Sequence, residues 1–276
     1  MFVLETETIE WEPVVKNHRT GTISRKFIRE SEAALGVGYT ADLVWYEPGG
    51  PFDAPRHRHT FDQLRFTISG EVDYGMGQVA TGGQVTFFPA GAYYGPEHID
   101  AAQILLVQWS RDWVTREMSD AAFSRLETRG EFADGKYVTT DASGNQVTVD
   151  SVDAVWEEAI GRPVSIPVAK YPQPVIMNPD GFAWKAAGDH VQFRDLGHLD
   201  EDFNPVQYKL SPGGQIELTD ERTQILWVSD GRVTIDERAL GAGTIVFSDP
   251  GEALTVTAEA ESTAMVFAMP TGSTPL

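Results

Sequence analysis

The stretch Pro55-Arg56-His57-Arg58-His59-Thr60-Phe61-Asp62-Gln63-Leu64-Arg65-Phe66 decides how this chain folds. Side chains two residues apart on an extended strand point to the same face of a sheet. If this stretch is an extended strand, one face of it carries the side chains of His57, His59, Gln63 and Arg65. Neutral imidazole is the commonest metal ligand in proteins, so the pattern predicts a metal site. A strand that carries two solvated histidines is the plainer alternative.

Turn signals and a second strand follow this stretch. Gly70 ends the first strand, and Gly82-Gly83 leads into a second strand at 84–89. Short runs with the composition of β-strands, bounded by glycine, proline or aspartate, occur in both halves of the chain, and those of the N-terminal half are 39–46, 63–69, 72–76, 85–88 and 104–109. Such runs are typical of β-barrels and β-sandwiches.

These two segments together resemble the paired motifs of the cupins, which are small antiparallel β-barrels that hold a metal ion in the mouth. The residues that match the first motif are Gly50, His57, His59, Gln63 and Gly70. One extra residue precedes His57, and Gln63 stands where glutamate is usual. The residues that match the second motif are Gly83, Pro89 and Gly91. Tyr94 takes the place of the family's third histidine, and His98 takes that of its terminal asparagine.

The C-terminal part of the chain repeats the plan of the N-terminal part. Pro48-Gly49-Gly50 reappears as Pro212-Gly213-Gly214. The distance from Gly70 to Pro89 is 19 residues, and so is the distance from Gly231 to Pro250. The resemblance therefore implies an all-β fold, a duplicated cupin of two jelly-roll (double-stranded β-helix) barrels with a short helical connection.

We expect three segments on this basis. Residues 1–115 form the N-terminal barrel with the metal site, 116–180 the connection, and 181–276 a degenerate second barrel without metal ligands. In the second copy the two histidine positions fall on Leu218 and Asp220. One metal ion per chain follows. That both barrels bind ligands without metal is the alternative.

The connection has the composition of helices at 120–126 and 152–160. Ser119 is a candidate N-cap for the first helix, and Asp150 or Ser151 for the second. A hairpin is predicted between them, at 137–140 and 146–149, and the proline-rich segment 162–180 is predicted to be an extended strap.

Composition excludes several classes of partner. The 276 residues carry a net charge of −20, which disfavours nucleic acid and anionic membranes as partners. The absence of cysteine excludes disulfides and thiolate chemistry. No signal peptide or membrane-length apolar run is visible, so we expect a soluble cytoplasmic protein. Because barrel edges need cover, we also expect a homodimer.

Gln63, Tyr94 and His98 are the residues on which the metal sphere depends. Gln63 can coordinate through its neutral carbonyl oxygen, hydrogen-bond a bound water or substrate, or only satisfy backbone groups. Tyr94 can ligate, hydrogen-bond a substrate or act as a general acid. His98 can replace it if the strand bulges at Gly95-Pro96, or lie on a surface turn beside Glu97. We expect Tyr94 and Gln63 to be the catalytic residues.

Arg65 has the inward parity, and an arginine inside a barrel needs an anion. The anion is either a substrate carboxylate or an internal partner, for which the candidates are Asp62, Glu71 and Asp73. The aromatic residues expected to line the substrate site are Tyr74, Tyr93 and Trp109, although most barrel aromatics belong to the core.

The segments His57-Arg58-His59 and Leu64-Arg65-Phe66 are also similar to ring-cleaving bicupins of the gentisate dioxygenase type. That resemblance implies ferrous iron, dioxygen and an aromatic carboxylate. The expected function is therefore a metal-dependent enzyme for a small anionic organic acid, with Fe(II) ahead of Zn, Mn or Ni. A non-redox isomerase, cyclase or lyase, and a non-catalytic binding cupin, are the alternatives.

Overall fold

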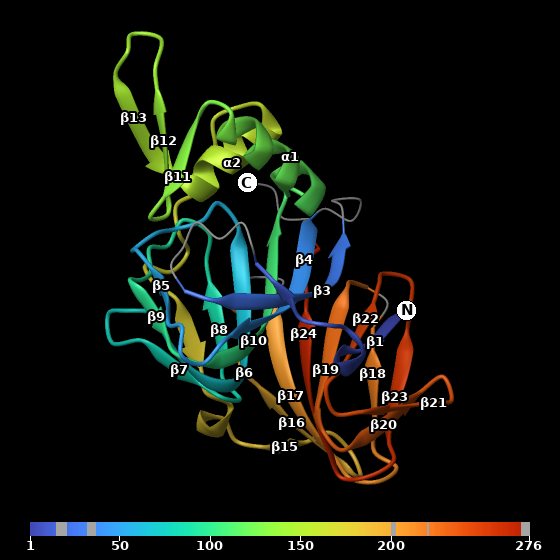
Figure 1. The fold of residues 1–276 in the computed structure, drawn as a ribbon. Coiled ribbons are helices and arrows are strands. Elements are labelled where there is room, and N and C mark those ends of the chain that lie inside the picture. Colours follow the sequence, from blue (N-terminus) through green and yellow to red (C-terminus); the bar gives the residue numbers. More distant parts are fainter. Residues whose placement is uncertain (15–20, 32–36, 200–202, 220, 272–276) are drawn as a thin grey trace. The chain divides into compact units, whose positions relative to one another are not determined.

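A computed structural model describes residues 1–14, 21–31, 37–199, 203–219 and 221–271 (Figure 1). The chain divides into two compact units, one of residues 11–176 and the other of residues 1–10 and 177–276. The boundaries predicted at 115 and 180 differ from this division. The first ten residues belong with the C-terminal barrel, and the connection up to Ile176 belongs with the N-terminal one.

The N-terminal barrel is built on a sheet with the strand order β14-β8-β6-β10-β4-β3-β2. Its strands are β2 (Glu12–Pro13), β3 (Ile23–Ser31), β4 (Gly38–Tyr46), β6 (Asp62–Asp73), β8 (Val85–Phe88), β10 (Ala102–Ser110) and β14 (Val175–Met177). Three shorter strands pair with one another or with β6, namely β5 (Phe52–Ala54), β7 (Val79–Thr81) and β9 (Glu97–Ile99). The antiparallel strands predicted around 63–69, 85–88 and 104–109 are confirmed.

The inward face of this barrel is apolar around Val44 and Ile104 and polar around Gln108. Directly opposite residues of antiparallel strands share a face, and Ile104 pairs with Val44, whereas Gln108 pairs with both Gln63 and Thr40. Val44, Ile104 and their neighbours form a buried apolar cluster. The candidate site therefore lies where apolar packing gives way to buried polar side chains.

The connection folds into two helices and a three-stranded sheet. Its elements are α1 (Arg116–Glu127), β11 (Gly130–Ala133), β12 (Lys136–Thr140), β13 (Gln146–Asp150) and α2 (Ser151–Ile160). Asp150 caps α2 as predicted, because its carboxylate accepts a hydrogen bond from the Val152 amide. The first helix begins earlier than predicted. Its N-cap is Thr115 rather than Ser119, and its Arg116 amide donates to the Glu30 carboxylate of β3.

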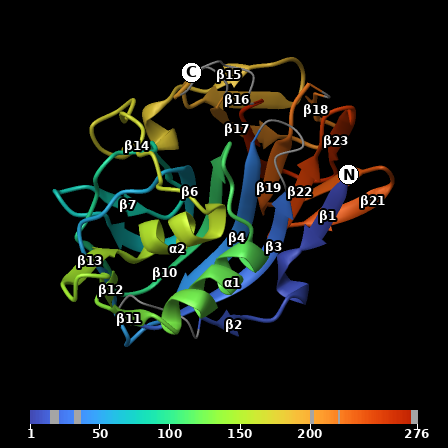
Figure 2. The same ribbon diagram turned by 90° about the horizontal axis from the view of Figure 1, so that it is seen from above.

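Both helices cover one end of the N-terminal barrel, as the view in Figure 2 shows. Trp156 of α2 packs with Phe61 and Val114 in a buried apolar cluster. None of the helices in the described ranges is long and apolar enough to span a membrane.

The second unit repeats the strand order of the first. Its main sheet runs β1-β22-β19-β24-β17-β16-β15, which matches the first sheet position by position. These strands are β1 (Phe2–Glu5), β15 (Lys185–Ala186), β16 (Val191–Asp195), β17 (Asn204–Leu210), β19 (Gln224–Asp230), β22 (Thr244–Ser248) and β24 (Ser262–Ala268). A second sheet holds β18 (Gln215–Leu218), β20 (Arg232–Ile235), β21 (Arg238–Gly241) and β23 (Leu254–Ala258), and short 3₁₀ turns lie at η1 (Thr6–Thr8) and η3 (Pro179–Gly181). The predicted duplication is confirmed.

The interior of the second barrel is packed with aliphatic side chains. Leu218, at a predicted histidine position, is 1% exposed and packs with Ile216, Val228 and Val256 in one buried cluster. Asp220, the other such position, lies outside the described residues. A close-packed apolar interior suits a structural role for this half.

Candidate functional site

The two halves of the predicted motif meet at His57 and Tyr94. The amide of each donates to the carbonyl of the other, both at 3.0 Å. The Tyr94 ring lies 4.3 Å from the His57 ring, and the His59 ring lies 5.0 Å from that of His57 at 74°. The structure therefore brings together both histidines and the residue at the third ligand position.

Gln63 joins this group through a chain of side-chain amides. Its Nε2 donates to the Tyr94 hydroxyl at 3.0 Å, while its Oε1 accepts from Gln108 Nε2 at 3.0 Å. Gln63 is 1% exposed, and burial makes both hydrogen bonds necessary. The Gln63 carbonyl oxygen is thus engaged by the chain itself.

Arg65 is neutralised from within the barrel. Its Nη1 forms an ion pair and hydrogen bond with Glu97 Oε1, and its Nη2 donates to the Tyr94 hydroxyl at 3.3 Å. The guanidinium carbon lies 4.5 Å from the Phe88 ring and 5.3 Å from the Tyr74 ring. Burial opposes its charge, but Glu97 and the nearby tyrosines together raise the pKa of Arg65 well above its ordinary value.

The His57 ring is oriented by the backbone. Its Nδ1 lies 2.6 Å from the Pro55 carbonyl oxygen. We infer that Nδ1 carries the proton, since a carbonyl oxygen only accepts. The lone pair then lies on Nε2, which is 3.8 Å from Glu97 Oε2. A metal-ligating imidazole usually donates its other ring N–H in the way that His57 Nδ1 donates to the Pro55 carbonyl.

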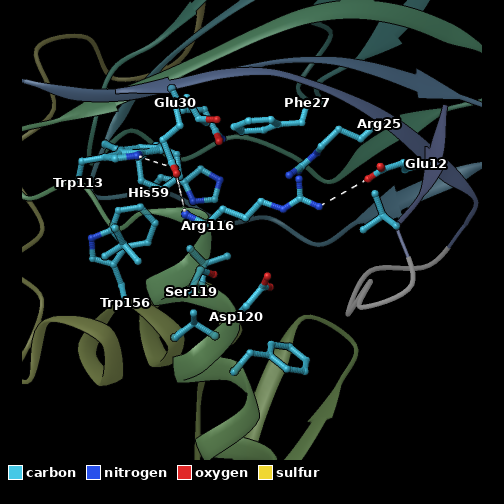
Figure 3. Close-up of a pocket in the computed structure, with 18 of the residues that line it drawn as sticks. Glu12, Arg25, Phe27, Glu30, His59, Trp113, Arg116, Ser119, Asp120 and Trp156 are labelled. Carbon is cyan, nitrogen blue, oxygen red and sulfur yellow. Dashed lines mark hydrogen bonds and ion pairs between the residues drawn. The ribbon is translucent and has the colours of Figure 1, made fainter. Parts of the chain in front are cut away.

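A cavity of about 590 Å³ opens beside His59, between the end of the barrel and helices α1 and α2 (Figure 3). His59 and Gln108 are part of its wall. Five aromatic side chains also line it, those of Phe27, Phe61, Trp113, Phe123 and Trp156. Cavities of this size and character are typical of small-molecule sites.

Charged groups gather on the side of the cavity that faces β3 and α1. Those that line it are Glu12, Arg25, Glu30, Arg116 and Asp120. Glu30 is held by the Arg116 amide and by the Trp113 indole at 3.2 Å, so it serves the start of α1. Figure 3 shows Trp113, Trp156 and His59 together on one side of the cavity, with Glu30 beside Trp113, and Arg25 and Glu12 on the other side.

Several predicted residues lie elsewhere. His98 is half exposed on the outer side of β9, and its Nδ1 lies 2.8 Å from the Asp53 carboxylate, a contact that raises its pKa. The structure does not bring His98 to His57, because Glu97 rather than His98 takes the inward position. Tyr93 is exposed and lies under the guanidinium groups of two arginines at 4.7 and 4.8 Å.

The remaining two aromatic candidates are buried outside the cavity wall. Trp109 stacks on Phe87 at 6.1 Å, on the face of β10 opposite to Gln108. Tyr74 packs edge-on against Phe88 at 4.8 Å, and burial raises its pKa. Their positions favour packing roles over contact with a substrate in the cavity.

Glu97 and Gln108 are the site residues that the sequence prediction missed. The partner of Arg65 is Glu97, not Asp62, Glu71 or Asp73. The alternation of side chains along residues 97–99 could have indicated this partner, because a strand that exposes His98 turns Glu97 to the inward face. Gln108 could have been found from the same parity in the predicted strand 104–109.

The donor set decides whether a divalent ion fits here. No group of three His, Cys, Asp or Glu side chains within the described ranges is arranged to hold one. A third donor of another kind is needed beside two imidazoles, which suit zinc, iron, copper or nickel, and the candidate is Tyr94, whose ring lies 4.3 Å from that of His57. The near-perpendicular rings of His57 and His59 and the backbone contact at His57 Nδ1 agree with such a site. The histidine pair thus fits a divalent ion, with Tyr94 as the candidate third ligand.

Solved structures share the fold of this chain, whereas no family model and no curated protein sequence matches it. A Nostoc punctiforme protein with a proposed dioxygenase name matches with a TM-score of 0.63 at 12% identity, over 99% of this chain and 84% of that one. Bacillus subtilis oxalate decarboxylase matches with 0.55 at 12% identity, over 97% and 76%. Lactobacillus farciminis oxalate decarboxylase matches with 0.54 at 10% identity, over 98% and 86%. The chain therefore has the duplicated all-β cupin fold.

Proposed function

We propose that the N-terminal barrel is a metal-dependent enzyme site that acts on a small aromatic acid. The observation that carries this proposal is the position of His59. Its ring belongs to the histidine pair and also to the wall of the 590 Å³ cavity. A molecule in the cavity would thus contact one of the residues that hold the ion.

His57, His59 and Tyr94 would hold the ion. A bound divalent ion supplies Lewis acidity and, if it is iron, a means of activating dioxygen. Gln63 and Arg65 both donate to the Tyr94 hydroxyl oxygen and fix its position. These two donors, together with the ion, would stabilise the deprotonated Tyr94 oxygen.

The cavity supplies binding and exclusion of water. Phe61, Trp113 and Trp156 contact one another edge-on or tilted, at centroid distances of 5.0 to 5.8 Å. Aromatic walls favour a planar apolar ring by burial and stacking. The His59 ring stacks on Phe61 at 4.5 Å, which links these walls to the histidine pair.

Oxygenation is the reaction class we propose first. It agrees with the aromatic cavity, with the resemblance of residues 57–66 to ring-cleaving bicupins and with the dioxygenase name of the Nostoc protein. A non-redox lyase or isomerase, in which the ion acts only as a Lewis acid, is the second candidate, favoured by the fold shared with the oxalate decarboxylases. Iron in the purified protein supports the first, and zinc or manganese supports the second.

Elemental analysis of matched variants tests the proposal. We expect close to one ion per chain in the wild type and near-complete loss in His57→Ala and His59→Ala. His98→Ala is the matched control, because His98 lies on the outer face of the same barrel and should not change metal content. Absence of metal after reconstitution, or equal loss in His98→Ala, would contradict the proposal and favour a non-catalytic binding protein.

A further inference from the structure

Next to Arg25, which lines the charged side of the cavity, lies a buried acid, Asp42, which does not itself line the cavity. Asp42 of β4 is 1% exposed and lies on the inward face with Thr40, which lines the cavity. Its Oδ2 lies 3.8 Å from Arg25 Nη1, beyond hydrogen-bond distance. Within the described part of the chain, its Oδ1 and the buried Arg25 Nε have no hydrogen-bond partner. A buried polar atom without a partner is costly, and here, among the described residues, Asp42 Oδ1 lacks a donor while Arg25 Nε lacks an acceptor.

Arg116 approaches the same place from helix α1. Figure 3 shows the side chains of Arg25 and Arg116 extending across the cavity toward one another. The half-exposed Arg116 guanidinium lies 5.4 Å from the Phe27 ring and 3.7 Å from the exposed Glu12 carboxylate. Burial raises the pKa of Asp42, the charges of Arg25 and Arg116 lower it, and the Glu30 carboxylate raises it.

Two guanidinium groups that face one another are favoured when an anion lies between them. We propose that Arg25 and Arg116 form an anion subsite that takes the carboxylate of an aromatic ligand, whose ring extends toward Trp113, Trp156 and His59. The proposal rests on the function proposed above and adds a direction of binding. The carboxylate lies at the arginine end, and the ring edge meets the histidine pair.

This assignment moves the anion-binding role from Arg65 to another wall of the barrel. Arg65 already has Glu97 as its partner and does not line the cavity. Arg25 and Arg116 do line it, on β3 and α1. The acids Glu12, Glu30 and Asp120 make a cationic ligand the opposing hypothesis, so the test must compare charges directly.

The test uses three probes of one shape and measures quenching of tryptophan fluorescence in metal-free full-length protein. The probes are 3-phenylpropanoate, its neutral amide and the 3-phenylpropylammonium cation. We expect the carboxylate to bind about tenfold or more tightly than the amide. Arg116→Gln should abolish that preference, and Arg116→Lys should keep part of it. Arg25→Gln is the less direct variant, since it also removes the countercharge of buried Asp42.

Arg129→Gln is the matched control, because Arg129 is an exposed arginine just beyond α1 that pairs with Glu158. It should leave the preference unchanged. Equal or weaker binding of the carboxylate, tightest binding of the cation, no measurable binding of the carboxylate, or an equal loss in Arg129→Gln would overturn the proposal. Metal content of Arg116→Gln should equal that of the wild type. Failure of metal loading in the wild type would instead refute the proposed function.

Discussion

Glu97 and Arg65 form an ion pair inside the N-terminal barrel, with side-chain exposures of 2% and 8%. The pair stands between the apolar core and the histidine pair, since Arg65 also donates to Tyr94 and Glu97 lies 3.8 Å from His57 Nε2. A buried pair of this kind is weak evidence for stability but makes each partner dependent on the other. Arg65 is therefore better explained as a residue that positions Tyr94 than as a contact for substrate.

Arg65→Ala should consequently destabilise the protein. The change leaves the Glu97 carboxylate buried and unpaired, which costs about 3–5 kcal/mol in the free energy of unfolding. The double variant Arg65→Met with Glu97→Leu should recover most of that loss, because no charge stays unpaired. Urea unfolding of the single and double variants measures both. A stable Arg65→Ala protein with weaker affinity for aromatic acids would instead show that Arg65 binds the substrate.

Tyr94→Phe tests the role of the hydroxyl group at the third ligand position. The ring can still pack against His57 and Phe88, but Gln63 and Arg65 lose their shared acceptor. Unsatisfied buried donors of this kind cost about 1–3 kcal/mol. We also expect weaker metal binding, measured by competition with a chelator. Tyr94→His, which builds the family's histidine sphere, should restore metal affinity. Unchanged affinity in Tyr94→Phe would exclude the hydroxyl as a ligand.

Asp153 gives the protein a pH dependence separate from the site. Burial and the neighbouring Asp150 and Glu157 carboxylates raise its pKa from 3.8 to about 6, against the opposing charges of Arg58 and Lys136. The folded state therefore prefers the neutral acid. The stability that the folded state gains from keeping the Asp153 carboxyl neutral is fully present below pH 3.8 and is lost as the pH rises through about 6.

Asp153→Asn should remove that dependence and stabilise the protein above pH 6 relative to the wild type. Thermal unfolding across pH 4 to 8 compares the two proteins. Parallel curves for wild type and variant over this range would show that Asp153 titrates normally.

Strand parity predicted much of the candidate site. His57, His59, Gln63 and Arg65 converge because they alternate along one stretch of backbone, and Tyr94 joins them because the second motif fixes its register. The second barrel was also predictable, since glycine and proline spacing survives where ligands are lost. Local sequence sufficed in these cases because the constraint lies within one strand or one turn.

Long-range contacts set the features that the sequence did not predict. Glu97 of β9 reaches Arg65 of β6, and 32 residues separate them in the chain. The start of α1 is fixed by Glu30, which is 86 residues away from Arg116. The cavity depends on how α1 and α2 dock on the barrel, and β1 pairs with β22 at the other end of the chain. Neither propensity nor spacing encodes such pairings.

The central claim is that one ion is bound beside the cavity by His57, His59 and Tyr94. A crystal structure of the zinc-loaded protein, with an anomalous difference map at the zinc edge, tests it most directly. We predict one strong peak per chain, about 2.0–2.2 Å from a nitrogen of each histidine and from the Tyr94 oxygen. A peak at His98 and Asp53, a peak in the second barrel, or no peak at His57 and His59 would contradict it.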